Sequence, residues 1–141
     1  MSYYRIKPEV PGGWGENIVV DRSVHPPIVH KLHYEFADWL GDELVTSFPC
    51  FLVTADLAKR LKAAHLTGSN LDEVEVTTSE EFADWNPGFK LPEFLWLKVF
   101  GVSGADDFGL LNGSKLIISQ QALDTIGPQH LKNALMEPWI K

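Results

Sequence analysis

Three histidines lie close together near the amino terminus, at positions 25, 30 and 33. Imidazole is the commonest neutral metal ligand in proteins, so such a group is compatible with a zinc site. On a strand, however, His30 and His33 face opposite sides, and Pro26 and Pro27 disfavour the helix that would bring them together. The spacing therefore predicts surface or half-buried histidines, and we expect no bound metal and no cofactor.

A second candidate for chemistry is the carboxylate pair Asp106 and Asp107 in a glycine-rich segment. Two adjacent carboxylates could bind calcium or act as an acid and base pair, but the spacing matches no calcium loop. The triplet from Asp107 to Gly109 also lacks every other motif of a protein kinase. Turn and cap roles are favoured, while a small metal-dependent hydrolase using His30, His33, Asp106 and Asp107 stays open as an alternative.

Nucleophilic and phosphate-binding motifs are not indicated. Cys50 is the only cysteine and follows Pro49 in an apolar run, which predicts a buried thiol with little thiolate. The glycine-rich stretch from Gly12 to Gly15 is not followed by the Lys and Ser of a phosphate loop, so it predicts a turn. We therefore expect a protein that is not an enzyme.

The most distinctive feature is a run of acidic residues with no Lys or Arg between Lys62 and Lys90. Such a run is either a solvated face or a surface that attracts a basic protein, because opposed potentials raise association rates. Trp85 follows the run and is a candidate apolar anchor. The predicted partner-binding residues are Asp72, Glu73, Glu75, Glu80, Glu81, Asp84 and Trp85.

Composition limits the classes of partner. The net charge of -7 argues against binding to nucleic acid or an anionic membrane, since both need clustered Lys and Arg. The start from Met1 to Arg5 lacks the apolar stretch of a secretory signal, and a single cysteine suits a reducing cytosol. No apolar run is long enough to cross a bilayer. These features predict a cytoplasmic protein.

The first part of the chain is punctuated by proline and glycine, and its elements are short. Alternation predicts a strand in the middle of Ile28–Leu40, although a helix from Tyr34 onward also fits the spacing. The further elements expected here are an edge strand at Tyr3–Ile6, a β-type run at Asn17–Val20, a short helix at Glu43–Thr46 and a buried strand at Cys50–Val53.

The second part contains clearer helix signals. Thr54 is the expected cap of a helix over Ala55–Ala64, and Thr78 with Glu81 resembles a capping box that opens a helix to about Trp85. The other expected elements are a strand from Leu71 to Thr77, a central strand at Phe94–Phe100, a hairpin around Asn112 and Gly113, and a helix at Gln120–Ile126 capped by Ser119. Leu131–Lys141 fits no single element. At 141 residues, the pattern predicts one α+β domain over residues 1–141, with a mainly antiparallel sheet packed by two or three short helices.

Several short segments combine strand, cap and helix-start patterns. They are Gly41–Leu44, Ser47–Thr54, Leu66–Gly68, Leu91–Phe94, and Asp106–Gly109 together with Leu116–Leu123. Together they resemble bacterial immunity-type proteins of polymorphic toxin systems. The resemblance extends from Gly41 to Leu123 and implies a cytosolic inhibitor that binds and blocks a cognate toxin domain, without cofactor or turnover. It carries no catalytic residues, and the residues before Gly41 lie outside it. A domain whose aromatic pocket binds a small molecule is a third possibility.

Overall fold

Two four-stranded antiparallel sheets form the main body of the structure, a computed structural model that describes residues 2–141. The first sheet contains β1 (Tyr3–Lys7), β11 (Phe108–Leu111), β12 (Lys115–Ser119) and β13 (Leu135–Trp139), in the order β11-β12-β1-β13. The second contains β6 (Leu44–Ser47), β7 (Cys50–Thr54), β8 (Ser69–Asp72) and β10 (Phe94–Val99), in the order β6-β7-β10-β8. The β10 strand is therefore interior, as the sequence predicted.

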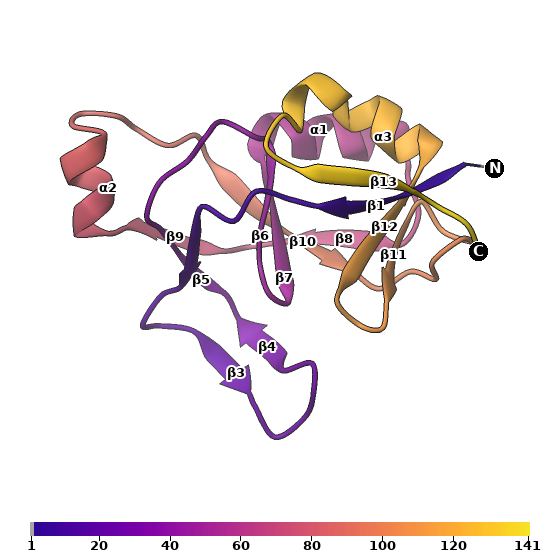
Figure 1. The fold of residues 1–141 in the computed structure, drawn as a ribbon. Helices are drawn as coiled ribbons and strands as arrows, with labels where there is room; N and C mark the ends of the chain where they lie inside the picture. The colour runs from indigo at the N-terminus through magenta and orange to yellow at the C-terminus, as the bar shows by residue number, and fades with distance from the viewer. Residues whose placement is uncertain (1) are drawn as a thin grey trace.

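Two smaller sheets extend this body (Figure 1). The strands β2 (Gly12–Trp14), β5 (His33–Phe36) and β9 (Glu75–Thr78) form one of them, and β5 pairs with β9 in parallel. The strands β3 (Val19–Asp21) and β4 (Ile28–Lys31) form a hairpin that projects away from the body.

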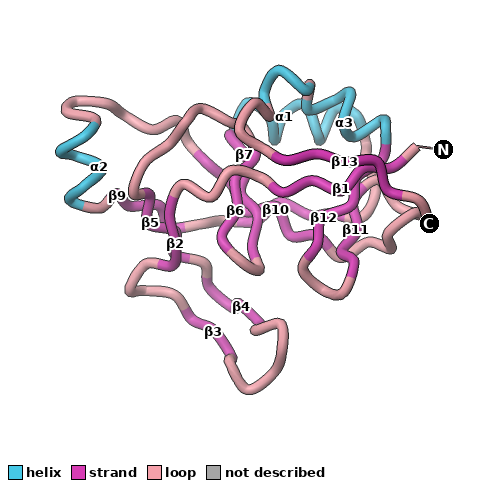
Figure 2. The backbone as a smooth tube through the Cα atoms, viewed as in Figure 1, coloured by secondary structure: helices cyan, strands magenta, loops and turns pink. Residues whose placement is uncertain are grey.

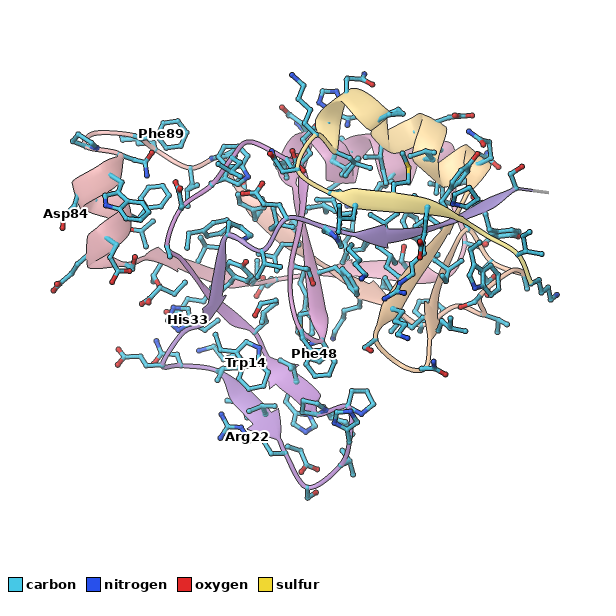
Figure 3. The ribbon with its side chains drawn as sticks, viewed as in Figure 1. Trp14, Arg22, His33, Phe48, Asp84 and Phe89 are labelled. Carbon is cyan, nitrogen blue, oxygen red and sulfur yellow. The ribbon has the colours of Figure 1, made fainter. Side chains whose placement is uncertain are left out.

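Aromatic contacts attach the projecting hairpin to its neighbours, which matters because a two-stranded hairpin is marginally stable by itself. The Arg22 guanidinium lies 5.4 Å from the centre of the Trp14 ring, and the His25 ring stacks on Phe48 at 6.0 Å between ring centres. Figure 3 shows Arg22 on the projecting hairpin, with Trp14 between it and the main body.

Two helices pack side by side on the main body, and a third lies apart from them. Both α1 (Ala55–Ala64) and α3 (Gln120–Ile126) follow a strand directly, and the hydroxyls of Thr54 and Ser119 cap them by accepting the amides of Leu57 and Ala122. A short 3-10 helix at Pro128–His130 follows α3. In contrast, α2 (Glu80–Trp85) lies at the opposite end of the molecule (Figure 2).

The buried side chains form two clusters. The first lies beneath α1 and α3 and includes Ile6, Leu57, Leu97, Phe108 and Ile118. The second cluster lies around β5 and includes Tyr34, Phe36, Leu52, Phe82 and Trp96. Because Phe82 belongs to α2, this cluster connects α2 to the second sheet. Alternate residues of β10 enter different clusters, so this strand is buried on both faces.

The α+β fold with mostly antiparallel sheets and three helices is confirmed, but several local predictions are wrong. The turn expected over Gly12–Gly15 is instead largely the strand β2, which pairs with β5. Glu43–Thr46 is not a helix, because β6 pairs with β7 from Leu44 opposite Val53 to Ser47 opposite Cys50. The first strand is not at an edge, because β13 covers its other side. The single strand expected from Leu71 to Thr77 is divided into β8 and β9, which belong to different sheets.

Other predictions agree with the structure. The helix over Ala55–Ala64, the helix over Gln120–Ile126 and the hairpin around Asn112 and Gly113 are present. Both Asn112 and Gly113 have positive φ, as a tight hairpin turn requires. Within residues 2–141, no helix has the length and apolar character needed to cross a bilayer.

Candidate functional site

The acidic run leads into α2, and one buried aromatic side chain attaches this short helix to the body. Ser79 caps α2 by accepting the amide of Phe82, while the Phe82 ring is buried and lies 6.3 Å from the ring of Phe89. Glu80 and Glu81 occupy the first turn, where the positive end of the helix dipole favours carboxylates. The sequence therefore favours a helix here even though its outer face is highly charged.

The cap itself differs from the one predicted from the sequence. We expected Thr78 to pair with Glu81 in a capping box, but the capping hydroxyl is that of Ser79. The Ser79 hydroxyl also lies 3.4 Å from a carboxylate oxygen of Glu81. The prediction was wrong by one residue because Thr78 still belongs to β9, where it is opposite Phe36.

The outer face of α2 carries carboxylates and the exposed Trp85, and the loop after the helix carries the partly exposed Phe89. We call Glu80, Glu81, Asp84, Trp85 and Phe89 the acidic knob. Helical spacing places Glu80 next to Asp84 and Glu81 next to Trp85. Trp85 is 70% exposed, which is unusual for so large an apolar side chain. Figure 3 shows Asp84 pointing away from the body and Phe89 in the loop that follows α2.

The acidic run is divided by the fold into neutralised and free carboxylates. Asp72 accepts a hydrogen bond from Lys98 at 2.8 Å, and that bond, the Glu73 amide and the lysine charge lower the pKa of Asp72. Glu75 accepts from Asn17 at 3.0 Å and lies 3.4 Å from Lys31. The Asn17 hydrogen bond, followed by the nearby His33 and Lys31, lowers the pKa of Glu75.

The remaining carboxylates of the run have no such partner. Across residues 2–141, no Lys, Arg or His forms an ion pair with Glu73, Glu80, Glu81 or Asp84. The cations that neutralise Asp72 and Glu75 come from β10 and β4, which are distant in sequence. The free negative charge therefore concentrates at α2 and Glu73.

The histidines suggested by the sequence occupy different environments. His33 was expected at the surface or half-buried, but it is buried in β5. Its Nδ1 accepts the Asn17 amide at 3.0 Å, and its Nε2 lies 2.7 Å from the Thr77 hydroxyl. His30 is an exposed residue of β4, and His25 lies against Phe48. The part of the chain that the structure describes contains no group of three or more His, Cys, Asp or Glu side chains arranged to hold a metal ion.

Asp106 and Asp107 both accept hydrogen bonds from the protein, but only the bond of Asp106 is local, as predicted for a turn residue. Asp106 accepts the Val102 amide at 2.7 Å. Asp107 accepts the Ser119 hydroxyl at 2.6 Å and the Thr67 amide at 2.9 Å. Both carboxylates thus hold the loop before β11, and neither contacts a histidine in the described residues.

Cys50 is a core residue, which confirms the prediction from its apolar neighbours. Burial raises the pKa of its thiol to about 12. A thiol with this pKa is almost entirely protonated near neutral pH, as expected of a core cysteine.

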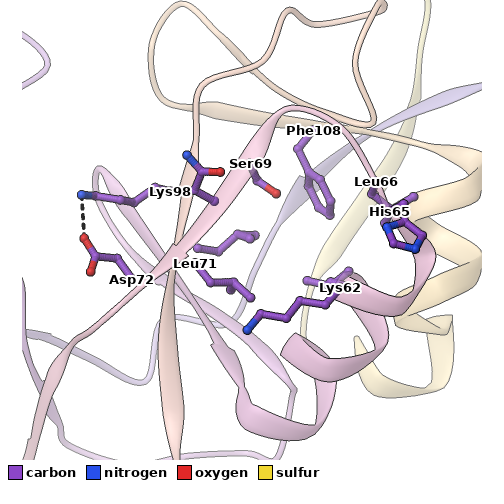
Figure 4. A pocket seen from close by; sticks show the side chains of 11 residues that line it. Lys62, His65, Leu66, Ser69, Leu71, Asp72, Lys98 and Phe108 are labelled. Carbon is purple, nitrogen blue, oxygen red and sulfur yellow. Dashed lines mark hydrogen bonds and ion pairs between the residues drawn. The ribbon is translucent and has the colours of Figure 1, made fainter.

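A groove next to β8 was not predicted. It has a volume of about 520 Å³ and lies between the end of α1 and β8 (Figure 4). The buried Leu97 and Phe108 are among the residues that line it. Its walls come from segments that are separate in sequence, and each segment alone looks like an ordinary helix or strand. In the sequence, only Lys62 and His65 at the end of the α1 segment could have indicated this groove, and they resemble ordinary surface residues.

Comparisons of the chain with family models, with curated proteins and with solved structures give no match. Its function is therefore inferred from the arrangement of its own side chains.

Proposed function

We propose that this protein is a cytoplasmic immunity-type inhibitor that binds a basic surface of a cognate bacterial toxin through the acidic knob. The observation that carries the proposal is the exposed Trp85 among carboxylates that have no ion-pair partner in residues 2–141. The resemblance of Gly41–Leu123 to immunity-type proteins supports the same function.

The acidic knob destabilises the free protein. Three carboxylates within one short helix repel one another, and a large exposed aromatic ring orders water around it. A basic partner relieves both costs at once, because it neutralises Glu80, Glu81 and Asp84 and covers Trp85. Aromatic residues surrounded by polar groups are typical of the centres of protein interfaces.

Charge reversal tests the electrostatic part of the proposal. The toxin domain encoded beside this protein is titrated with the Glu80→Lys, Glu81→Lys double variant by calorimetry, and association rates are measured at several salt concentrations. We expect affinity to fall by about tenfold or more, mainly through slower association, and the salt dependence to decrease. Asp124→Lys is the matched control, since this exposed carboxylate lies on α3, at the other end of the molecule.

Replacing Trp85 by Ala tests whether its ring is an apolar anchor for the toxin. Trp85→Ala should change the free energy of unfolding by no more than about 0.5 kcal/mol, because the side chain is mostly exposed. It should weaken toxin binding by roughly 30-fold if Trp85 is a central contact. Phe100→Ala, at a residue that is 65% exposed just after β10, is the control. Unchanged affinity in both the charge-reversed and the Trp85 variants would show that the toxin binds elsewhere.

A further inference from the structure

The second sheet ends at β8, and the outer edge of this strand is open. The amide of Phe100 donates to the Gly68 carbonyl at 2.9 Å, and Lys98 and Trp96 face Asn70 and Asp72 in the same register. Hydrogen-bonded and non-hydrogen-bonded pairs alternate in antiparallel sheets. The backbone groups of Ser69 and Leu71 therefore point away from β10, toward the open edge.

No other segment of residues 2–141 uses these backbone groups. Among residues 2–141, no backbone or side-chain hydrogen bond links Ser69 or Leu71 to a strand beyond β8. Other sheet edges differ in this respect. The β6 edge is partly used, since Thr46 donates its amide to the Glu9 carbonyl, and β13 contains Pro138, which lacks an amide donor.

The 520 Å³ groove follows this open edge and reaches both faces of the strand. On the face toward α1, it is lined by Leu71, Leu97, Phe108 and Leu61, of which the last three are buried. On the opposite face, Asn70, Asp72 and Lys98 line it. A compact small molecule would fill one face, whereas an extended chain beside β8 sends alternate side chains to both faces.

The charge at the groove is opposite to that of the acidic knob. Lys62 and His65 lie at its rim on the α1 side, and neither forms an ion pair within the described residues. Figure 4 shows the Lys62 side chain extending across the groove toward β8. On the other face, Asp72 already neutralises Lys98 at 2.8 Å. The unpaired positive charge is therefore on the same side as the apolar floor.

We propose that the β8 groove binds an extended peptide segment that pairs with β8 as an added strand. The segment places an apolar side chain on the floor formed by Leu71, Leu97 and Phe108. A carboxylate side chain two residues away lies on the same face and pairs with Lys62 and His65. The backbone groups of Ser69 and Leu71 form the hydrogen bonds, and the two side-chain contacts select the sequence. This site is independent of the acidic knob and of the proposed function.

The test uses short blocked peptides and the full-length, isotope-labelled protein in NMR titrations. The probes are acetyl-Thr-Leu-Thr-Glu-Thr-amide and the reversed order acetyl-Thr-Glu-Thr-Leu-Thr-amide, which cover both strand directions. We expect at least one of them to shift the amide signals of Ser69 and Leu71 in a saturable way and to slow their hydrogen exchange. No saturable shift at these amides with either peptide at millimolar concentration would overturn the proposal.

Backbone methylation then distinguishes strand pairing from other binding. One analogue carries N-methyl groups at Leu and Glu, and another carries them at the three Thr residues. Since alternate residues of an added strand face β8, only one analogue should lose binding, by about tenfold or more. Equal affinity of the two analogues would overturn the proposal.

Two further variants test the charge and the independence of the site. Lys62→Glu should favour a probe with Lys in place of Glu, and the Glu80→Lys, Glu81→Lys variant should bind the original probe as well as the wild type does. A Lys62→Glu variant with unchanged preference would overturn the assigned contact. Saturable binding of phenylacetate to the groove, without a peptide effect on β8 amides, would identify a small-molecule site instead and would also overturn the proposal.

Discussion

Replacing Glu43 by Gln should destabilise the protein by an amount that can be worked out from its contacts. The Glu43 carboxylate accepts hydrogen bonds from Arg60 Nη1 at 3.2 Å and Nη2 at 3.1 Å, and one from the Thr54 hydroxyl at 2.9 Å. His130 Nδ1 lies 2.8 Å from the same carboxylate. These contacts join α1, β7 and the segment after α3, so the carboxylate connects elements that are far apart in sequence.

The free-energy cost of Glu43→Gln depends on how far Glu43 and Arg60 are shielded from solvent. The Glu43 side chain is only 13% exposed, whereas that of Arg60 is 38% exposed. Hydrogen bonds to charged groups contribute about 1.5–3 kcal/mol when shielded, and exposed ion pairs contribute less than about 1 kcal/mol. Because solvent reaches Arg60, we expect Glu43→Gln to cost about 2 kcal/mol. For a domain of this size, that corresponds to a fall in Tm of roughly 6 °C.

The pH dependence provides a second measure of the same contacts. Burial alone would raise the pKa of Glu43, but the hydrogen bonds from Arg60 and Thr54 and the nearby Arg60 and His130 outweigh it and hold the pKa below its ordinary value of 4.5. A lowered folded-state pKa means that the stabilisation is complete above about pH 4.5 and is lost as the pH falls through the folded-state pKa. The wild type and Glu43→Gln should therefore differ most near neutral pH and converge in acid.

The assay is urea unfolding followed by tryptophan fluorescence, applied to a double-mutant cycle of Glu43→Gln and Arg60→Met. Arg60 also donates to the Ile126 carbonyl at 3.2 Å, so the single Arg60 variant loses more than the ion pair, and only the cycle isolates the pair. We expect a coupling free energy of about 1.5 kcal/mol, larger than that of the exposed Lys98 and Asp72 pair measured in the same way. A coupling below about 0.5 kcal/mol, or a loss that persists unchanged at acidic pH, would refute the reasoning.

Two further predictions concern the backbone and the buried thiol. Gly68 and Gly41 both have positive φ, but a Cβ at Gly68 would lie 2.1 Å from the Phe108 carbonyl oxygen whereas a Cβ at Gly41 meets nothing within 4 Å. In urea unfolding, Gly41→Ala should therefore cost about 1–2 kcal/mol and Gly68→Ala at least twice as much, and equal costs would contradict the close contact. The Cys50 thiol, whose pKa burial raises to about 12, should not react with a disulfide reagent at pH 8 until the protein is unfolded in urea, so rapid labelling of the folded protein would show that the thiol is accessible.

Elements whose signals are local were predictable from the sequence. Thr54 and Ser119 are capping residues directly before helices with an apolar face, and both helices are where the pattern placed them. Asn112 and Gly113 are turn residues between two apolar runs, and they form the expected hairpin. In these segments, the deciding interactions lie within a few residues of one another.

The wrong predictions share a different cause, since each depends on a distant partner. Val45 and Thr46 are β-branched and compatible with a strand, but their strand is stabilised by pairing with Leu52 and Phe51 of β7. The position of β1 inside its sheet depends on β13, a segment whose pattern fits no single element. The chain alone also gave no indication that Lys98 and Lys31 would neutralise Asp72 and Glu75. The ion pairs of Asp72 and Glu75 were therefore not predictable from the acidic run, whereas the placement of Glu80, Glu81 and Asp84 on a helix was.

The central position of β1 in its sheet has a consequence for how the protein is made. Tyr3 pairs with Ser119 on one side and with Trp139 on the other, so this sheet requires contacts between the first and last parts of the chain. During synthesis, β1 leaves the ribosome long before β12 and β13 have been made, so this sheet cannot form until synthesis reaches those strands. The unit formed by β6, β7 and α1 uses local contacts and can assemble earlier. Closing the long loop between β1 and β12 should thus limit the folding rate.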